Sequence, residues 1–494
     1  MSASTYTASL AGSSARSALA WAPVAAAMVL AAAAIALLPL GLAAIVVVGA
    51  LATLVSLVRV EYGLSLLALA VPFESLKAFG MGDFSITFTE VLCGLLALAW
   101  LGHGAVHRRL PLVVNPMAVV ITLFVVLVAV SVGVAESLGL ALKELLRWLQ
   151  VLLVYLLVVS LARQTRWQKL LVAALFVAAG LEVLLGVYQF FTRTGPPSFG
   201  VGSFLRAYGT FGQPNPYAGY LGMVAPLAYA LAFFWGRRAR IDWLRLLAWL
   251  VLAGTLAASL MSFSRGGWMG LAMALVAVTA LASRRGAVLT AVGLVVLASL
   301  AVLGMANLLP ASILGRLSIL ADYFSIFDVR EVLVTPENWA LVERMAHWQA
   351  AWYMYEDHVL FGVGIGNYVA AYPSYYLTIW KDPLGHAHNL YLNMLAEMGA
   401  IGLVGYLLMV GSWFGLGLLS LRRSEPGFSR ALALGCLGVL TASAAHNVFD
   451  NLYVHGLNVH LAIILGLLSL AGSKPSGIRR ELNWQEQTKV PWPR

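Results

Sequence analysis

Long apolar runs separated by short polar turns dominate this chain from about residue 21 to residue 472. A helix that crosses a bilayer needs about 20 mainly apolar residues. Runs near that length predict candidate spans at 21–38, 41–57, 62–73, 86–102, 116–134, 148–162, 170–191, 217–235, 246–263, 267–283, 287–308, 398–420, 431–446 and 456–472. The first two are short and closely joined, and Pro72 interrupts the third, so the pattern predicts about twelve to fourteen transmembrane helices.

Composition narrows the class of protein further. Hydrophobic residues make up 61% of the chain and charged residues only 11%, whereas soluble domains carry about 25% charged residues. This excludes an ordinary soluble enzyme, a disordered chain and a disulfide scaffold. Cys93 and Cys436 both lie in apolar runs, so neither a disulfide framework nor a thiolate metal site is expected. We therefore predict an all-α polytopic membrane protein.

The distribution of basic residues indicates how the chain crosses the membrane. The formal net charge is +10, and Lys and Arg concentrate in cytoplasmic loops of membrane proteins. With fourteen spans and the N-terminus inside, the main clusters all fall on the cytoplasmic side: Arg108-Arg109, Arg163 to Lys169, Arg237 to Arg245, Arg284-Arg285, Arg422-Arg423 and the tail from Lys474. The positive excess therefore indicates membrane orientation and does not suggest nucleic-acid binding.

This topology predicts the organisation of the whole chain. Residues 1–20 form a cytoplasmic tail and lack the pattern of a cleaved signal peptide. The expected parts that follow are a transmembrane bundle at 21–308 with an outer loop at 192–216, a long outer segment at 309–397, C-terminal transmembrane helices at 398–472 and a cytoplasmic tail at 473–494. The long outer segment is rich in Trp and Tyr, which argues against disorder. It predicts short helices at the membrane interface, one of them over 339–358.

Three of the few arginines on the outer side, where basic residues are the minority, are candidates for a functional role. Arg206 lies in the outer loop, Arg265 lies in the tight turn Ser-Arg-Gly-Gly at 264–267, and Arg344 lies in the long segment. The planar guanidinium group suits phosphate, because it donates two parallel hydrogen bonds and stays charged. These residues are therefore candidates for binding a phosphorylated donor, although arginines can also extend toward lipid headgroups.

Histidines also gather on the outer side. The sequence Gly-His-Ala-His-Asn at 385–389 directly precedes an apolar helix, and histidine is the usual general base near neutral pH. His386 and His388 are two residues apart and could instead bind a metal. Because cysteine ligands and a nearby pattern of acidic ligands are missing, we expect no metal here.

Other polar features have simpler interpretations. The glycine-rich stretch 362–368 does not fit nucleotide-binding spacing, so it predicts a turn that shapes the site. Glu356 is expected to lie at a solvated edge, and Asp357 is a candidate to orient a basic partner. Glu182 lies inside an apparent span, where it can be either a helix–helix hydrogen-bond partner or part of a proton relay.

Several motifs together resemble the O-antigen ligase and polymerase superfamily of bacterial membrane glycosyltransferases. The ligase pattern of His-Asn, nine residues and Gly-x-x-Gly is matched by His388-Asn389 and by Gly399 with Gly402. Further matches are Gly-Thr-Phe-Gly-x-Pro-Asn at 209–215, Ser-Arg-Gly-Gly at 264–267, Arg344 with Trp348, and Gly-Val-Gly-Ile-Gly-Asn-Tyr at 362–368. The resemblance covers about residues 200–460 in family order, and the family usually has about twelve spans.

The resemblance implies a transferase at the periplasmic face of the bacterial inner membrane. The charge pattern places both termini in the cytoplasm. The donor of such a transferase would be a glycan on undecaprenyl pyrophosphate and its acceptor lipid A–core, and it would need no cofactor and no metal. By analogy His388 activates the acceptor hydroxyl for an inverting attack, and Arg206, Arg265 and Arg344 hold the pyrophosphate. Supporting roles would fall to Asn389, Asn215, His386, Asp357, Gly399 and Gly402.

Other functions stay open from the sequence. Relatives with the same motifs polymerise glycan repeat units or transfer glycans to protein hydroxyls, so the acceptor is not fixed. A transporter or lipid flippase belongs to a different class and should show internal repeats and ionisable residues inside spans. No repeat is evident, and the clear charges within spans are Glu90 and Glu182. The concentration of candidate residues at one face favours a transferase.

Overall fold

The computed structural model describes residues 59–473 except for 77, 82–83, 107, 109, 111, 237–241, 306–325 and 336–337. The expected spans at 21–38 and 41–57 lie outside the described residues. So do the predicted tail at 1–20, nearly all of the tail at 473–494 and part of the predicted basic clusters.

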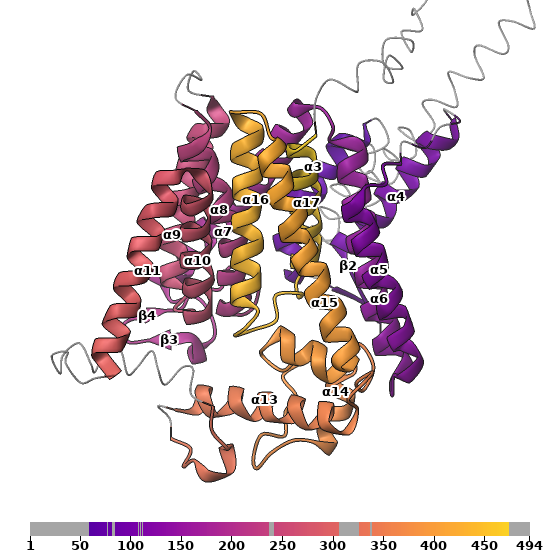
Figure 1. Cartoon of the computed structure of the whole chain (residues 1–494). Coiled ribbons are helices and arrows are strands. Elements are labelled where there is room, and N and C mark those ends of the chain that lie inside the picture. The colour runs from indigo at the N-terminus through magenta and orange to yellow at the C-terminus, as the bar shows by residue number, and fades with distance from the viewer. Residues whose placement is uncertain are drawn as a thin grey trace, which may run out of the picture.

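The described part of the chain is built from helices (Figure 1), as the hydrophobic pattern predicts. Each of the other twelve expected spans coincides with a helix: α3 (Val60–Ala70), α4 (Phe88–Val106), α5 (Pro116–Ser131), α6 (Leu138–Leu161), α7 (Thr165–Thr192), α8 (Pro214–Phe234), α9 (Trp243–Met261), α10 (Arg265–Ala282), α11 (Arg284–Met305), α15 (Leu390–Arg423), α16 (Phe428–His446) and α17 (Leu457–Ala471). Among the described residues, nine helices are long and apolar enough to cross a membrane. The all-α polytopic membrane fold is confirmed.

Short elements that the apolar pattern does not show lie between the helices. Two small antiparallel hairpins pair β1 (Ala78–Met81) with β2 (Phe84–Thr87) and β3 (Gly200–Val201) with β4 (Phe204–Leu205). The 3-10 helices are η1 (Val71–Leu76), η2 (Val132–Val134), η3 (Pro197–Phe199), η4 (Val329–Glu331) and η5 (Tyr372–Ser374). The hairpin β3–β4 lies in the expected outer loop, at the end of the bundle that carries the site.

The centre of the bundle is formed by α8 and α16, which are buried on most of their surface. These two helices pack against each other, and α10 packs against both. Small residues on the facing sides allow this close approach, as in other membrane helix pairs. By contrast, α11 packs chiefly on α10 and exposes most of its apolar side chains, as expected for a helix that faces lipid.

The described part of the expected outer segment, residues 326–335 and 338–389, forms a layer across one end of the bundle (Figure 1). Its main helix, α13 (Trp339–Asp357), confirms the helix predicted over 339–358, and α14 (Tyr368–Ala371) follows it. Two small hydrophobic clusters stabilise this layer, one around Tyr368 and Tyr372 and one around Val342 and Trp380. Ordered aromatic packing therefore replaces the disorder that a long connection can have.

Helix α15 begins at Leu390, eight residues earlier than the expected start at 398. The early part contains Asn393 and Glu397, whose polarity lowers the hydropathy of the segment. Both side chains are buried, and they accept hydrogen bonds from the backbone N–H groups of Ala387, Gly366 and Tyr368. Polar residues can continue a buried helix when such partners exist.

Gly399 breaks α15 in two. Its φ of 64° lies in the left-handed region, and a Cβ there would overlap the carbonyl group of Leu360. The break opens the helix backbone to the segment after α13, so the N–H of Ala400 donates to the carbonyl of Val359 at 2.8 Å. The spacing in the family motif therefore has a structural meaning: nine helical residues separate the cap Asn389 from the break.

Candidate active site

The histidine loop, residues 384–389, lies directly before α15. Asn389 caps the helix, because its side-chain oxygen accepts from the N–H groups of Tyr391 and Leu392 at 3.0 and 3.1 Å. The N–H of Leu390 donates to the carbonyl groups of Asn447 and Asp450 in the turn between α16 and α17. These bonds place the histidine loop beside that turn, 62 residues further along the chain.

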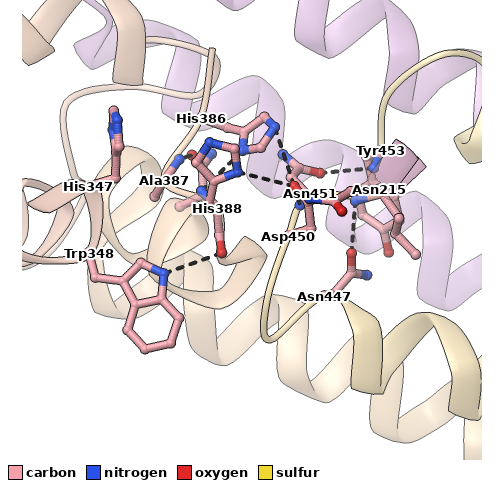
Figure 2. A network of polar contacts seen from close by, with 12 residues as sticks. Asn215, His347, Trp348, His386, Ala387, His388, Asn447, Asp450, Asn451 and Tyr453 are labelled. Atoms are coloured by element: carbon pink, nitrogen blue, oxygen red, sulfur yellow. Dashed lines mark hydrogen bonds and ion pairs between the residues drawn. The ribbon is translucent and has the colours of Figure 1, made fainter. Parts of the chain in front are cut away.

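His388 and His386 both face one carboxylate (Figure 2). The Nδ1 of His388 lies 3.4 Å from Oδ1 of Asp450, and the Nε2 of His386 lies 3.7 Å from the same oxygen. The backbone N–H of Asn451 also donates to it at 2.9 Å. The His388 backbone is held at a φ of 51°, and Trp348 of α13 donates from its indole to the His388 carbonyl.

The surroundings of Asp450 and His386 determine which of the two side chains is ionised. Burial opposes ionisation of Asp450, but the hydrogen bond from His388 and the nearby His386 hold the pKa of the carboxyl well below its usual range. Burial lowers the pKa of His386 to about 4, with Asp450 acting in the opposite direction. At neutral pH the cluster therefore contains an ionised aspartate and a neutral His386.

Hydrogen bonding also decides whether the cluster suits a metal. Single ligand atoms of His386, His388 and Asp450 all lie within 4.8 Å of one another. However, the Nδ1 of His386 accepts from the backbone N–H of His388 at 3.1 Å, so the neutral ring carries its proton on Nε2, toward Asp450. A nitrogen must lose its proton to ligate a metal. The residues therefore fit a hydrogen-bonded triad better than a metal site.

The arginine loop, residues 206–213, forms the second part of the site. The Nε of Arg206 donates to the carbonyl of Ser262 at 2.9 Å, and its Nη2 donates to the side chain of Asn215 at 3.3 Å. The N–H of Ala207 donates to the carbonyl of Met261. These contacts bring Arg206 to the turn between α9 and α10, three residues before Arg265.

Arg265 is the first residue of α10 and is exposed, and Ser264 caps the helix by accepting from the N–H of Gly267. A Cβ on the neighbouring Gly266 would lie 3.0 Å from Phe449 and 3.3 Å from the ring of His446. The Arg265 turn therefore packs against the same 446–450 segment that holds the histidine loop.

Arg344 reaches the site from α13. Its charge acts on the side chains of Glu343 and His446. Burial raises the pKa of the Glu343 carboxyl, whereas His388 and Arg344 lower it. The structure thus brings His388, the Arg265 turn and Arg344 to the segment 446–450. Arg206 lies against the turn that precedes Arg265, although these residues are far apart in the chain.

The remaining expected residues have structural contacts. Asp357 accepts from the hydroxyl of Tyr375 at 2.9 Å, at the end of α13 away from Trp348, and Glu356 accepts from the indole of Trp352. The structure therefore does not bring Asp357 to the histidine loop. Asn389 and Gly399 shape the two ends of the first part of α15, while Gly402 packs closely against Met398.

Asp450 is the functional candidate that the sequence motifs do not include. Its signal in the sequence is a cluster of polar residues, His446, Asn447, Asp450 and Asn451, in a turn between two apolar runs. Polar clusters at the end of a membrane span usually have a function. The pairing of this turn with residues 386–388 depends on tertiary packing, so spacing along the chain does not reveal it.

Comparison with known families agrees with the motifs. Residues 250–407 match the O-antigen ligase family, which confirms the resemblance to the O-antigen ligase and polymerase superfamily. No curated protein matches the chain. A solved structure described as "Structural coordination of polymerization and crosslinking by a peptidoglycan synthase complex" is similar, with a TM-score of 0.38 and 18% identity, over 72% of this chain and 96% of that chain.

Proposed function

We propose that this multi-pass membrane protein, which carries an O-antigen ligase domain at 250–407, transfers a glycan from undecaprenyl pyrophosphate to an acceptor hydroxyl. The reaction takes place at the periplasmic face of the bacterial inner membrane, and the most specific form of the proposal is ligation of O-antigen to lipid A–core. The observation that carries it is the pairing of His388 with Asp450, in a segment that also packs against the Arg265 turn and lies near Arg344.

His388 acts as the general base in this proposal. The ionised Asp450 accepts from Nδ1–H of His388, which leaves the lone pair of Nε2 available for the acceptor. The acceptor oxygen attacks the anomeric carbon as its proton passes to Nε2. Asp450 holds the ring in the required tautomer and stabilises the imidazolium that forms, as in other catalytic histidine–carboxylate pairs.

The arginines act on the leaving group. As the new glycosidic bond forms, the bond between the anomeric carbon and the pyrophosphate oxygen breaks, and undecaprenyl pyrophosphate departs with the electron pair. Guanidinium groups already fixed at the site stabilise this charge without reorganisation. Attack from the side opposite the leaving group inverts the anomeric configuration. The chemistry supplied by these side chains requires no nucleotide sugar.

The test uses the purified protein in lipid nanodiscs with an undecaprenyl-pyrophosphate glycan. Lipid A–core, a second repeat unit on undecaprenyl pyrophosphate and a pilin-like protein are supplied as acceptors in parallel. Transfer to lipid A–core is expected, and His388→Ala should reduce kcat by about 10²- to 10⁴-fold, the usual contribution of a general base. Exposed His358, at the end of α13, provides the control variant His358→Ala.

Each outcome has a distinct meaning. Transfer only to a repeat unit would replace the ligase assignment with a polymerase, and transfer only to protein would indicate an oligosaccharyltransferase. Undiminished transfer by His388→Ala would remove the general-base assignment. Movement of the lipid-linked glycan across the bilayer without any transfer would favour a flippase.

A further inference from the structure

Glu182 lies within α7, far from the ends of the helix, and its side chain is fully buried. A carboxyl group inside a membrane span is costly, so it usually has a specific partner or function. The partner of Glu182 is the arginine loop. The N–H of Thr210 donates to Oε2 of Glu182 at 3.0 Å, and the Thr210 hydroxyl donates to Oε1 at 2.7 Å.

Gln189 contacts the same loop from a position two turns further along α7. Residues seven apart share one face of a helix. The side-chain oxygen of Gln189 accepts from the N–H groups of Tyr208 and Gly209 at 3.2 and 2.8 Å, and its amide donates to the carbonyl of Gly209 at 2.8 Å. Together Glu182 and Gln189 satisfy four backbone groups of three consecutive loop residues.

The loop fits this face of α7 closely. Gly209 has a φ of 55°, and a Cβ there would overlap the carboxyl group of Glu182 and the ring of Tyr217. On the other side, the Thr210 carbonyl accepts from the hydroxyl of Ser75 at 2.6 Å. The loop is therefore held between α7 and η1, and its backbone has one well-defined position.

That position fixes Arg206. Two residues separate Arg206 from Gly209, so the loop backbone held on α7 leads directly to Arg206, whose guanidinium group contacts the Ser262 carbonyl and Asn215. Asn215 follows the same loop, in the first turn of α8. A change at Glu182 therefore alters the placement of a phosphate-binding candidate without touching the donor itself.

We propose that Glu182 and Gln189 are positioning residues, which act from inside the membrane to hold the arginine loop so that Arg206 can bind the donor pyrophosphate. The inference rests on the proposed function. It also distinguishes two roles for Glu182. A proton relay requires an ionisable group, whereas positioning requires only a side chain that can pair with Thr210.

Conservative and disruptive variants separate these roles. In Glu182→Gln the amide oxygen can accept from the Thr210 N–H, and the amide nitrogen can donate to the Thr210 oxygen, whose hydroxyl then turns to the Pro72 carbonyl. We expect its donor KM to stay within about threefold of wild type. Glu182→Ala and Gln189→Leu should raise donor KM about tenfold or more, as loss of a buried hydrogen-bond partner does. Gln168→Leu is the control, because Gln168 is buried at the other end of α7.

A double-mutant cycle tests whether the effect passes through Arg206. In an Arg206→Ala background, adding Glu182→Ala should change donor KM less than about twofold, because the group that it positions is already gone. Fully additive effects would overturn the proposal. Loss of activity in Glu182→Gln as large as in Glu182→Ala would also overturn it, in favour of a proton-transfer role.

Hydrogen exchange in nanodiscs gives a readout that does not depend on activity. The amides of Tyr208, Gly209 and Thr210 should exchange faster in Glu182→Ala and Gln189→Leu, but not in Glu182→Gln or Gln168→Leu. Unchanged exchange in all four variants would overturn the positioning role of Glu182 and Gln189 even if His388→Ala abolishes transfer. Faster exchange in Glu182→Ala and Gln189→Leu, in a protein without transferase activity, would support the positioning role. Only the proposed reaction would then be rejected.

Discussion

The histidine loop and the arginine loop meet at one site, but they are held in place in different ways. The histidine loop is fixed by the start of the helix that follows it and by a neighbouring turn: the Asn389 side chain caps the helix, and the Leu390 N–H bonds to two carbonyl groups of the turn after α16. The arginine loop is fixed by side chains of α7, chiefly Glu182 and Gln189, which lie within a membrane span.

The difference has a physical cause. The histidine loop precedes a helix, and capping bonds fix the chain within one turn of that helix. The arginine loop is irregular backbone at the edge of the membrane, where unpaired N–H and C=O groups are costly. Its polar groups therefore need partners from neighbouring helices. The histidine loop is positioned by the cap of the helix that follows it and by the turn after α16. The arginine loop is positioned by residues that lie 20 and 28 positions earlier in the chain.

The largest expected effect tests Asp450, the distant carboxylate that pairs with His388 in the histidine loop. Asp450→Asn keeps the shape of the side chain but removes the charge that orients His388. We expect kcat to fall about 10²- to 10⁴-fold, as when a catalytic histidine loses its carboxylate partner, with little change in donor KM. Steady-state transfer assays in nanodiscs measure both constants.

Asp328→Asn provides the control, because Asp328 lies in the layer formed by α13 and its neighbouring segments, away from the turn that holds Asp450, and pairs with Arg330. It should transfer glycan at the wild-type rate. Wild-type kcat in Asp450→Asn would show that backbone bonds alone position His388, and the contrast between the two loops would become sharper.

The same contrast explains what the sequence could predict. Alternating apolar runs and basic turns predict the helices, because lipid requires long apolar spans and each backbone group bonds within its own helix. His388, Asn389 and Gly399 form a motif because one helical segment links them. The roles of Asp450 and Glu182 depend on which helices pack together. Sequence periodicity does not reveal that packing, so Asp450 is missing from the motif, and the sequence does not distinguish a hydrogen-bond partner from a proton relay at Glu182.

A smaller effect on transfer is expected from a change at Arg265, one of the arginines proposed to bind the pyrophosphate. Arg265→Glu reverses the charge at the start of α10, and we expect donor KM to rise about 10- to 100-fold, consistent with loss of a charge-assisted hydrogen bond. kcat should fall less than in Asp450→Asn. The exposed Arg193, at the end of α7 on the same side, provides the control Arg193→Glu. Unchanged donor affinity in Arg265→Glu would remove this residue from pyrophosphate binding.

The smallest effect concerns His386, whose pKa of about 4 in the folded protein lies below its ordinary value of 6.5. Between these values the unfolded chain binds more protons than the folded chain at this residue. His386 therefore does not lower the free energy of unfolding above pH 6.5, and lowers it progressively as the pH drops toward 4. For this one group the loss is at most about 3 kcal/mol. His386→Gln removes the titration but can still accept from the His388 N–H and donate to Asp450. We therefore expect its melting temperature to depend less on pH than that of wild type.

Thermal unfolding in nanodiscs at pH 7.5 and pH 5 measures this difference, with His358→Gln as the exposed control. Transfer at pH 7.5 should fall less than about tenfold in His386→Gln, since Asp450 and His388 remain paired. Equal pH dependence of wild type and His386→Gln would show that His386 is not buried neutral against Asp450. The triad would then reduce to the His388–Asp450 pair, and the histidine loop would depend on its backbone bonds even more than the structure indicates.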